Sequence, residues 1–259
     1  MRKFWYAVGI VALGWGALAS AAPAGDPAAE ALMERVQASM PDVPLELEAA
    51  IRVVDAYGKN LKSVGAEALL TPTANGRTAR YRLRDAFGGL QAEMTVALAH
   101  GQADFAYATG DPPQAAPLPD LFGPIEGSEI SWMDLSFSYF WWPEPRIVGT
   151  EKVANRWECQ VIEIACPPAY GPGWSHVRLW VAPAYNAVVR GEAWRDGQPA
   201  KRFEVKSVKK LRRIYMIGDM EVKNLATGAR ARLKVGKMKM RSPDYSPEEL
   251  EEFNAPIAW

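Results

Sequence analysis

The alternation of apolar and polar residues predicts that most of the chain after residue 45 is β-sheet. Runs such as YRLR at 81–84 and AEMTVAL at 92–98 place their apolar side chains on one face. Turn-forming stretches separate such runs, namely AYGKNL, TANGRT, AFGGLQ and AHGQAD. Four hairpin turns within about sixty residues indicate an antiparallel meander.

Extended runs resume after a loop rich in proline and glycine at 111–127. Seven runs follow between 146 and 241, with hairpin turns at 196–198 and 226–228. Together they predict a mainly β (α+β) protein: one antiparallel sheet of about eleven strands with few helices. A sheet this long curls, and its apolar inner face needs a cover.

The last strand changes its register near Gly236-Lys237. Leu233 and Val235 have odd numbers, whereas Met238 and Met240 have even numbers. A β-bulge at this point would keep all four side chains on one face.

Three segments could cover the sheet. Residues 26–41 predict a helix that Asp26 caps and Pro27 begins, with an apolar stripe of Ala28, Leu32, Val36 and Met40. The stretch ISWMDLSFSYFWWPEP at 130–145 contains six aromatic residues, and helical spacing would set its apolar side chains on one side. Residues 246–253 predict a short C-terminal helix with a capping box.

The first residues have the pattern of a cleavable signal peptide. Two basic residues precede an apolar run at 4–18, and Ala19-Ser20-Ala21 provides a small-x-small cleavage site. The apolar run is 15 residues long, short of the roughly 20 that span a bilayer. We expect cleavage after Ala21 and an exported, periplasmic single domain at 22–259; an uncleaved membrane anchor is the alternative.

Charge is distributed unevenly although the formal net charge of the chain is zero. Residues 201–241 contain fourteen Lys and Arg against three acidic residues, a net of +11. One interpretation is a solvated sheet face, and the other is attraction to an acidic partner or to anionic lipid headgroups. The possible docking face consists of Arg232, Lys234, Lys237 and Lys239. Export argues against nucleic acid as a partner.

The sequence offers little catalytic chemistry. Neither His100 nor His176 has metal-ligand spacing, and nucleophile-elbow and phosphate-loop motifs are absent from the sequence. Asp134 is the most suggestive carboxylate, but helix capping explains it better than acid–base catalysis. We therefore predict no enzyme activity, cofactor or metal.

The two cysteines, Cys159 and Cys166, flank a run that reads as strand. A straight strand would hold them about 23 Å apart, whereas a disulfide needs Cα atoms within about 7 Å. Seven residues apart, they face opposite sides of a sheet. Two free cysteines are favoured unless the strand turns back before Cys166.

Several short motifs, in order, resemble one family. They are SWMDLS at 131–136, WP at 142–143, WECQVIE at 157–163, SHVRLWV at 175–181, KRFEV at 201–205 and MEVKN at 220–224. They are similar to the LolA-like group of exported outer-membrane lipoprotein-sorting proteins. The chain departs from the family pattern at Met133, where the family commonly has Glu.

This resemblance implies a half-open barrel whose concave face is covered by helices and takes the acyl chains of lipoproteins. Methionine and aromatic side chains suit such a groove because they are apolar and adapt their shape. The expected cavity residues, each of which could equally be ordinary core, are Trp132, Met133, Phe137, Phe140, Trp141, Val177, Leu179, Val181, Phe203, Val205, Met216, Met220, Val222, Leu233, Val235, Met238 and Met240.

Two functions from different classes follow. The first is a monomeric, non-enzymatic carrier or chaperone for lipid-modified proteins or free lipid, with inner- or outer-membrane lipoprotein transport machinery as possible partners. The second is an envelope interaction module with the same fold and a filled core, which docks an acidic partner through its basic strands. A hydrolase built on Asp134 and a histidine is a third, weaker hypothesis.

Overall fold

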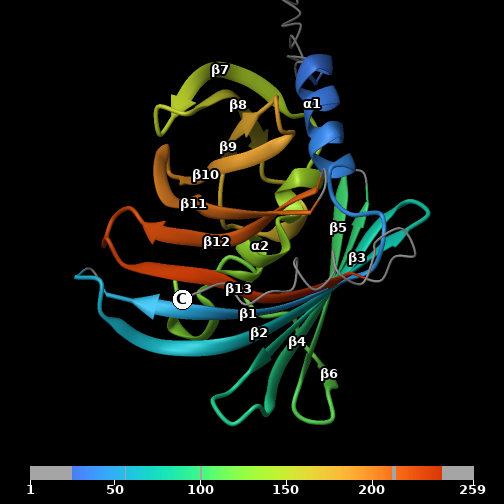
Figure 1. The fold of residues 1–259 in the computed structure, drawn as a ribbon, viewed down its shortest axis with the longest axis vertical. Coiled ribbons are helices and arrows are strands. Elements are labelled where there is room, and N and C mark those ends of the chain that lie inside the picture. The colour runs from blue at the N-terminus through green and yellow to red at the C-terminus, as the bar shows by residue number, and fades with distance from the viewer. Residues whose placement is uncertain (1–24, 56, 100, 212–213, 241–259) are drawn as a thin grey trace, which may run out of the picture.

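The computed structural model describes residues 25–55, 57–99, 101–211 and 214–240. They form one antiparallel sheet of thirteen strands (Figure 1). The strands are β1 (Leu45–Val54), β2 (Asn60–Thr73), β3 (Gly76–Arg84), β4 (Leu90–Ala99), β5 (Gln102–Thr109), β6 (Gln114–Ala116), β7 (Arg146–Val153), β8 (Trp157–Ala165), β9 (His176–Ala182), β10 (Ala187–Arg195), β11 (Gln198–Leu211), β12 (Ile214–Asn224) and β13 (Arg230–Met240). The helices are α1 (Pro27–Ala38), α2 (Trp132–Ser136) and the 3-10 turns η1 (Ile125–Gly127), η2 (Ser138–Trp141) and η3 (Pro168–Tyr170).

The sheet consists of two meanders joined through their terminal strands. Its order is β6-β5-β4-β3-β2-β1-β13-β12-β11-β10-β9-β8-β7, so β1 pairs with β13 in the middle. The edge strands β6 and β7 are joined by residues 117–145, which contain α2. This connection runs across the hollow of the curled sheet, as Figure 1 shows. The result is the half-open barrel with few helices that we expected.

Each expected hairpin is present. The four turns of the first meander separate β1 to β5, and the turns at 196–197 and 225–229 separate β10 from β11 and β12 from β13. The strand count is higher than expected, because the segment at 111–127 that reads as loop contains the short strand β6.

The bulge in the last strand is also confirmed. Glu48 pairs with Lys237 and Ala49 pairs with Val235, so that Gly236 is left without a partner in the ladder. The extra residue keeps Leu233, Val235, Met238 and Met240 opposite the odd-numbered residues of β1, on the inner face.

Helix α1 begins as the sequence predicts. The Asp26 carboxylate accepts hydrogen bonds from the backbone N–H of Ala28 at 2.9 Å and of Ile147 at 3.2 Å, which ties the helix to β7. The buried stripe differs from the expected one by one position: Ala29, Leu32, Met33 and Val36 are buried, whereas Ala28 is exposed. The helix therefore turns slightly about its axis relative to the expected orientation.

Three predictions fall outside the described residues: the signal peptide at 1–21, His100 and the C-terminal helix at 246–253. Among the helices that the structure describes, none has the length and apolarity needed to cross a membrane.

Candidate functional site: the aromatic lid and the inner face of the sheet

Residues 130–142 form a compact plug against the inner face, which we call the aromatic lid. Ser131 caps α2, and its hydroxyl and the Asp134 carboxylate form a capping box. The expected continuous helix is wrong, because Phe137 adopts a left-handed conformation with φ 48° and separates α2 from η2. The break turns successive aromatic side chains in different directions, so most of the lid is buried rather than one side of it.

Tyr139 lies at the centre of the lid. Its ring is 5.3 Å from that of Phe140, 6.0 Å from Phe203 of β11 and 6.3 Å from Trp174. Edge-to-face and stacked pairs at such distances add to the stabilisation from area burial. Burial raises the pKa of Tyr139 well above its ordinary value, and the nearby Asp134 carboxylate raises it further.

A buried ion pair joins the lid to the sheet. Lys201 Nζ on β11 lies 2.8 Å from Asp134 Oδ2, and their side chains are 14% and 3% exposed. The same oxygen accepts hydrogen bonds from the Ser131 backbone N–H at 2.8 Å and from the Ser131 hydroxyl at 2.7 Å. Three contacts therefore converge on Asp134 Oδ2, which agrees with a capping role for this carboxylate.

Two further contacts hold the lid in place. Gln37 of α1 donates a hydrogen bond from Nε2 to the Phe140 carbonyl at 2.7 Å. Tyr170 of η3 stacks on Trp142 at 5.8 Å, and its hydroxyl bonds to both the backbone N–H and the carbonyl of Ala103 on β5. The hydroxyl contact connects the two halves of the barrel across its opening.

The space beneath the lid is small. A cavity lined by Asp134, Tyr139, Trp174, Lys201 and Phe203, among others, measures about 10 Å³. A water molecule needs roughly 10–15 Å³ by this measure, so the cavity has room for about one water. An acyl chain cannot enter it unless the lid moves.

The structure places the expected cavity residues on the inner face and in the lid. Thirteen are buried: Trp132, Met133, Phe140, Trp141, Val177, Leu179, Val181, Phe203, Met220, Val222, Val235, Met238 and Met240. Four are half-buried: Phe137, Val205, Met216 and Leu233.

These residues do not form one cluster. The lid, α1 and most inner-face residues make up the main core. A separate cluster of Leu45, Val235, Met238 and Met240 lies at the end of the inner face where β1 begins and β13 ends, and half-buried Leu47, Ala49, Leu70 and Met216 pack against it. We call this cluster with its half-buried neighbours the methionine-rich end. Among the described residues, no helix or lid side chain belongs to it.

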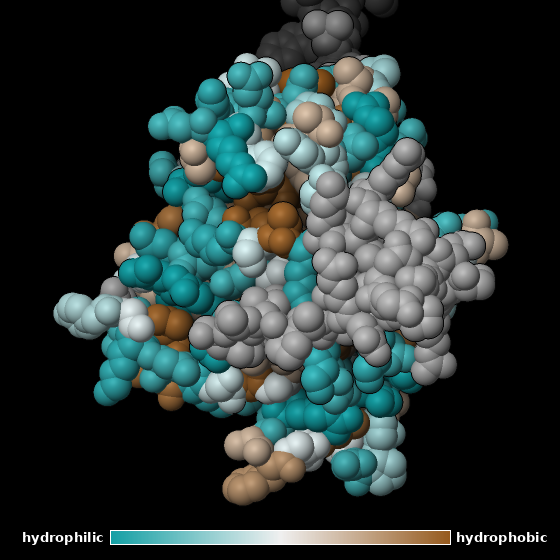
Figure 2. Space-filling view, in the orientation of Figure 1, coloured by the Kyte–Doolittle hydropathy of each residue, from teal (hydrophilic) through white to brown (hydrophobic). Residues whose placement is uncertain are grey.

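Part of the surface near the lid is apolar. Near α2, β10 and β11, Figure 2 shows a hydrophobic area recessed between hydrophilic rims.

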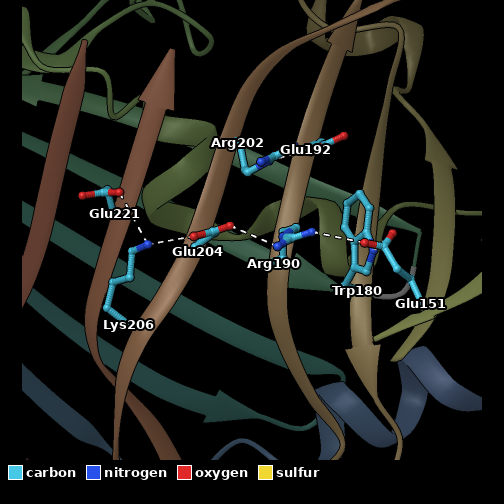
Figure 3. A network of polar contacts seen from close by, with 8 residues as sticks. All are labelled: Glu151, Trp180, Arg190, Glu192, Arg202, Glu204, Lys206 and Glu221. Atoms are coloured by element: carbon cyan, nitrogen blue, oxygen red, sulfur yellow. Dashed lines mark hydrogen bonds and ion pairs between the residues drawn. The ribbon is translucent and has the colours of Figure 1, made fainter. Parts of the chain in front are cut away.

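Ion pairs connect neighbouring strands on the outer face of the sheet, and they partly neutralise the charge of the basic strands. Figure 3 shows one network from Glu221 through Lys206 and Glu204 to Arg190, which lies 3.4 Å from Glu151 and over the Trp180 ring. In the same view Arg202 pairs with the buried Glu192 at 2.6 Å.

The four residues of the possible docking face lie on this outer face, as the alternation predicts. Arg232 pairs with Glu221 at 3.1 Å and Lys237 with Glu48 at 3.3 Å. Lys237 and Lys239 line a groove of about 230 Å³ together with residues of β1, β2 and β3, including Glu46, Glu67, Arg80 and Arg82. The groove carries both signs of charge, so it has little electrostatic preference for an acidic partner.

The remaining candidate catalytic and metal-binding residues do not lie together in one site. His176 stacks on Trp194, with Nε2 3.5 Å from Glu163, and burial lowers its pKa. The His176 ring thus contacts Ser175, Glu163 and Trp194. Among the described residues, no group of three or more His, Cys, Asp or Glu side chains could hold a metal ion.

Both cysteines are free, as favoured from their spacing. Cys159 packs in an outer-face cluster with Val161 and Trp180, whereas Cys166 packs against the main core. Burial raises the pKa of each thiol to about 11.

Comparisons with known proteins identify a family and several solved structures with a similar fold. A family model described as "Uncharacterized protein" matches residues 117–251, slightly more than half of the chain. The chain belongs to this family. A search of curated proteins found no match.

Solved structures give the fold. The chain is similar to a DUF1329 family protein from Desulfovibrio piger, with TM-score 0.70, 13% identity and coverage of 88% of this chain and 96% of that one. It is similar to a putative outer membrane lipoprotein-sorting protein domain from Vibrio parahaemolyticus, with TM-score 0.67, 13% identity and coverage of 86% and 97%. It also resembles a LolA superfamily protein from Nitrosomonas europaea, with TM-score 0.59, 13% identity and coverage of 86% and 96%. The resemblance to the LolA-like group is thus confirmed at the level of the fold.

Several residues of the lid region were not expected from the sequence. The sequence gives Lys201 only as part of the basic segment 201–241 and of the KRFEV motif, and it gives Gln37 no separate role. Trp174 and Tyr170 come from the β8–β9 loop, where they pack against the lid. The only sequence signal for them is two large aromatic residues among prolines and glycines at 167–174, which need burial somewhere.

Proposed function

We propose that this protein is an exported, periplasmic, non-enzymatic carrier that binds acyl chains of lipoproteins or free lipids on the inner face of the half-barrel. The observation that carries the proposal is the methionine-rich end, where flexible apolar side chains lie outside the cluster that the lid fills. Methionine adapts to irregular apolar ligands, and an acyl chain makes no hydrogen-bond demands.

The lid controls how far a bound ligand can extend along the inner face. Ligand at the methionine-rich end can extend beneath the lid only if the lid moves away from β11. Phe137 of the lid and Leu233 of β13 are half-buried and pack against the main core, so we choose them to test contact with such a chain.

The test is uptake of a fluorescent fatty acid by purified protein. Leu70→Ser and Leu233→Ser on the inner face and Phe137→Ser in the lid each put a hydroxyl at a half-buried apolar position. Each should weaken uptake at least tenfold while circular dichroism stays unchanged. The matched controls, Lys234→Glu and Lys239→Glu on the outer face, should leave uptake unchanged.

The interaction module with a filled core is the competing function, and the packed lid favours it. If wild-type protein takes up no fatty acid, the carrier function is refuted. Loss of cellular function in the two charge reversals alone would support the interaction module instead.

A further inference from the structure

Two hairpin tips of the first meander are built alike. The β1–β2 turn has the sequence Asp55-Ala56-Tyr57-Gly58-Lys59, and the β3–β4 turn has Asp85-Ala86-Phe87-Gly88-Gly89. The first and last residues of each turn are bonded to one another, with the Asp N–H donating to the carbonyl of residue 59 or 89 at 3.0 Å. The same pattern thus recurs at two places about thirty residues apart in the sequence.

The aspartate fixes the backbone of each tip. Asp55 Oδ1 accepts from the N–H of Tyr57 at 2.9 Å and of Lys59 at 2.8 Å. Asp85 Oδ1 accepts from the N–H of Phe87 at 2.9 Å and of Gly89 at 2.8 Å. The following glycine has φ +90° in one tip and +85° in the other, a conformation that favours glycine.

Each fixed tip holds an aromatic ring in solvent. Tyr57 is 96% exposed and Phe87 is 98% exposed, and Leu61, at the start of β2, is 60% exposed. Single exposed apolar side chains are common on protein surfaces, so the informative feature is that two such rings sit on two similarly fixed tips. The aspartate hydrogen bonds hold the loop backbone in the conformation that presents the ring.

Both tips lie at the same end of the sheet, because each is the turn that follows an odd-numbered strand. Figure 1 shows the β1–β2 and β3–β4 tips projecting from the body at the left and at the bottom of the view. In this projection both tips lie on the outside of the sheet, away from α2 (Figure 1).

A protein partner fits these tips less well than a membrane. Stable protein interfaces bury about 800 Å² of continuous surface on each partner. Two rings on separate hairpins do not form a continuous patch. The interfacial region of a bilayer accepts single aromatic side chains without shape complementarity, and aromatic residues concentrate there.

The basic residues near the first tip also favour a membrane, in particular one with anionic headgroups. Lys59 in the tip and Lys223 at the end of β12 are exposed. Basic residues near a membrane surface add about 1 kcal/mol each for anionic headgroups.

We propose that Tyr57 and Phe87 form a two-pronged anchor that inserts into the interface of an anionic phospholipid membrane. The anchor does not depend on acyl-chain binding, because its residues belong neither to the lid nor to the inner face. It would hold the barrel at the membrane surface by the ends of two hairpins.

The test is flotation with vesicles of phosphatidylethanolamine and phosphatidylglycerol at 3:1. Protein recovered from the periplasm of cells that express the full chain is compared with Tyr57→Ser, Phe87→Ser and the double variant. Each single change should weaken vesicle binding about tenfold, equivalent to about 1.4 kcal/mol, and the double change should abolish it. Tyr185→Ser, which removes an aromatic residue that is 46% exposed outside the first meander, is the matched control and should bind as wild type does.

Replacement of phosphatidylglycerol by phosphatidylcholine should weaken binding of the wild type, because the basic residues then lose their partner. Asp85→Ala should weaken binding although it keeps the ring, because the loop is no longer fixed. Wild-type protein that does not float, or a double variant that floats as well as wild type, overturns the proposal. Fatty-acid uptake measured on the same variants should be unchanged, which separates failure of the anchor from failure of the carrier function.

Discussion

At the scale of single residues, the lid is held by a few buried polar contacts within an apolar core. The Asp134–Lys201 pair is the most consequential, because both partners are removed from water. The attraction between them largely offsets the cost of burying two charges, but removal of one partner leaves the other uncompensated. This pair was not predicted from the sequence, since Lys201 and Asp134 are 67 residues apart and only the tertiary fold brings them together.

Lys201→Met should lower the free energy of unfolding by about 3–5 kcal/mol, because the Asp134 carboxylate remains buried without its cation. The double variant Lys201→Met with Asp134→Leu should recover part of this loss. Urea denaturation followed by tryptophan fluorescence measures both. A double-variant loss equal to the sum of the losses in Lys201→Met and Asp134→Leu alone would show that the charges are not coupled.

Burial of the two thiols makes stability depend on pH at the alkaline end. Folding raises the thiol pKa of Cys159 and Cys166 from the ordinary 9.0 to about 11. Between these values the unfolded chain releases protons that the folded chain retains, so stability is complete below about pH 9 and falls toward pH 11. Melting temperatures measured from pH 8 to pH 11 should decrease, and Cys159→Ala should reduce the slope. A flat profile contradicts this assignment.

At the scale of elements, the strands were predictable and the lid was not. The hairpins could be predicted from the alternation of apolar and polar residues and from the turn residues. The bulge at Gly236 could be predicted because the apolar residues of the last strand change from odd to even numbers. The break at Phe137, where φ is 48°, could not be read from the sequence, because no glycine or proline marks it. The rotation of α1 could not be predicted either, because the exposed Ala28 and the buried Ala29 are both apolar.

The packing of β10 against β11 gives a test of the inner face. A Cβ at Gly191 would lie 2.1 Å from the Phe203 ring, so Gly191→Ala should destabilise the protein by about 1–3 kcal/mol through overpacking. Gly149→Ala in β7 is the control, because no atom lies within 4 Å of its Cβ position. Thermal denaturation compares the two variants, and Phe203→Leu should rescue the first. Similar stability of both alanine variants would mean that Phe203 does not cover Gly191.

At the scale of the whole molecule, the connection between the edge strands both closes the half-barrel and limits access to it. The lid is continuous with both edges, so its movement needs no change in the strand pairing of the sheet. The motif order allowed the half-barrel to be predicted through the LolA-like resemblance. The filled space beneath the lid was not predictable, because inner-face apolar residues look alike whether they line a cavity or a core.

Loosening the lid should speed ligand entry. Gln37→Ala removes the hydrogen bond to the Phe140 carbonyl, worth about 1 kcal/mol, and should raise the rate of fatty-acid uptake about fivefold. Ser39→Ala removes bonds to Val36 and Asn186 that do not involve the lid, and its rate should match that of wild type. Stopped-flow fluorescence measures the rates. Equal rates in both variants would mean that the lid does not control entry.

Native mass spectrometry of the protein purified from the periplasm tests the central claim most directly. A carrier should retain cellular lipid, so the spectrum should contain a species heavier than the polypeptide by the mass of an acyl-containing molecule. Phe137→Ser should shift the population toward the unliganded mass. Protein that is consistently free of lipid, and that stays so after incubation with fatty acid, would contradict the account.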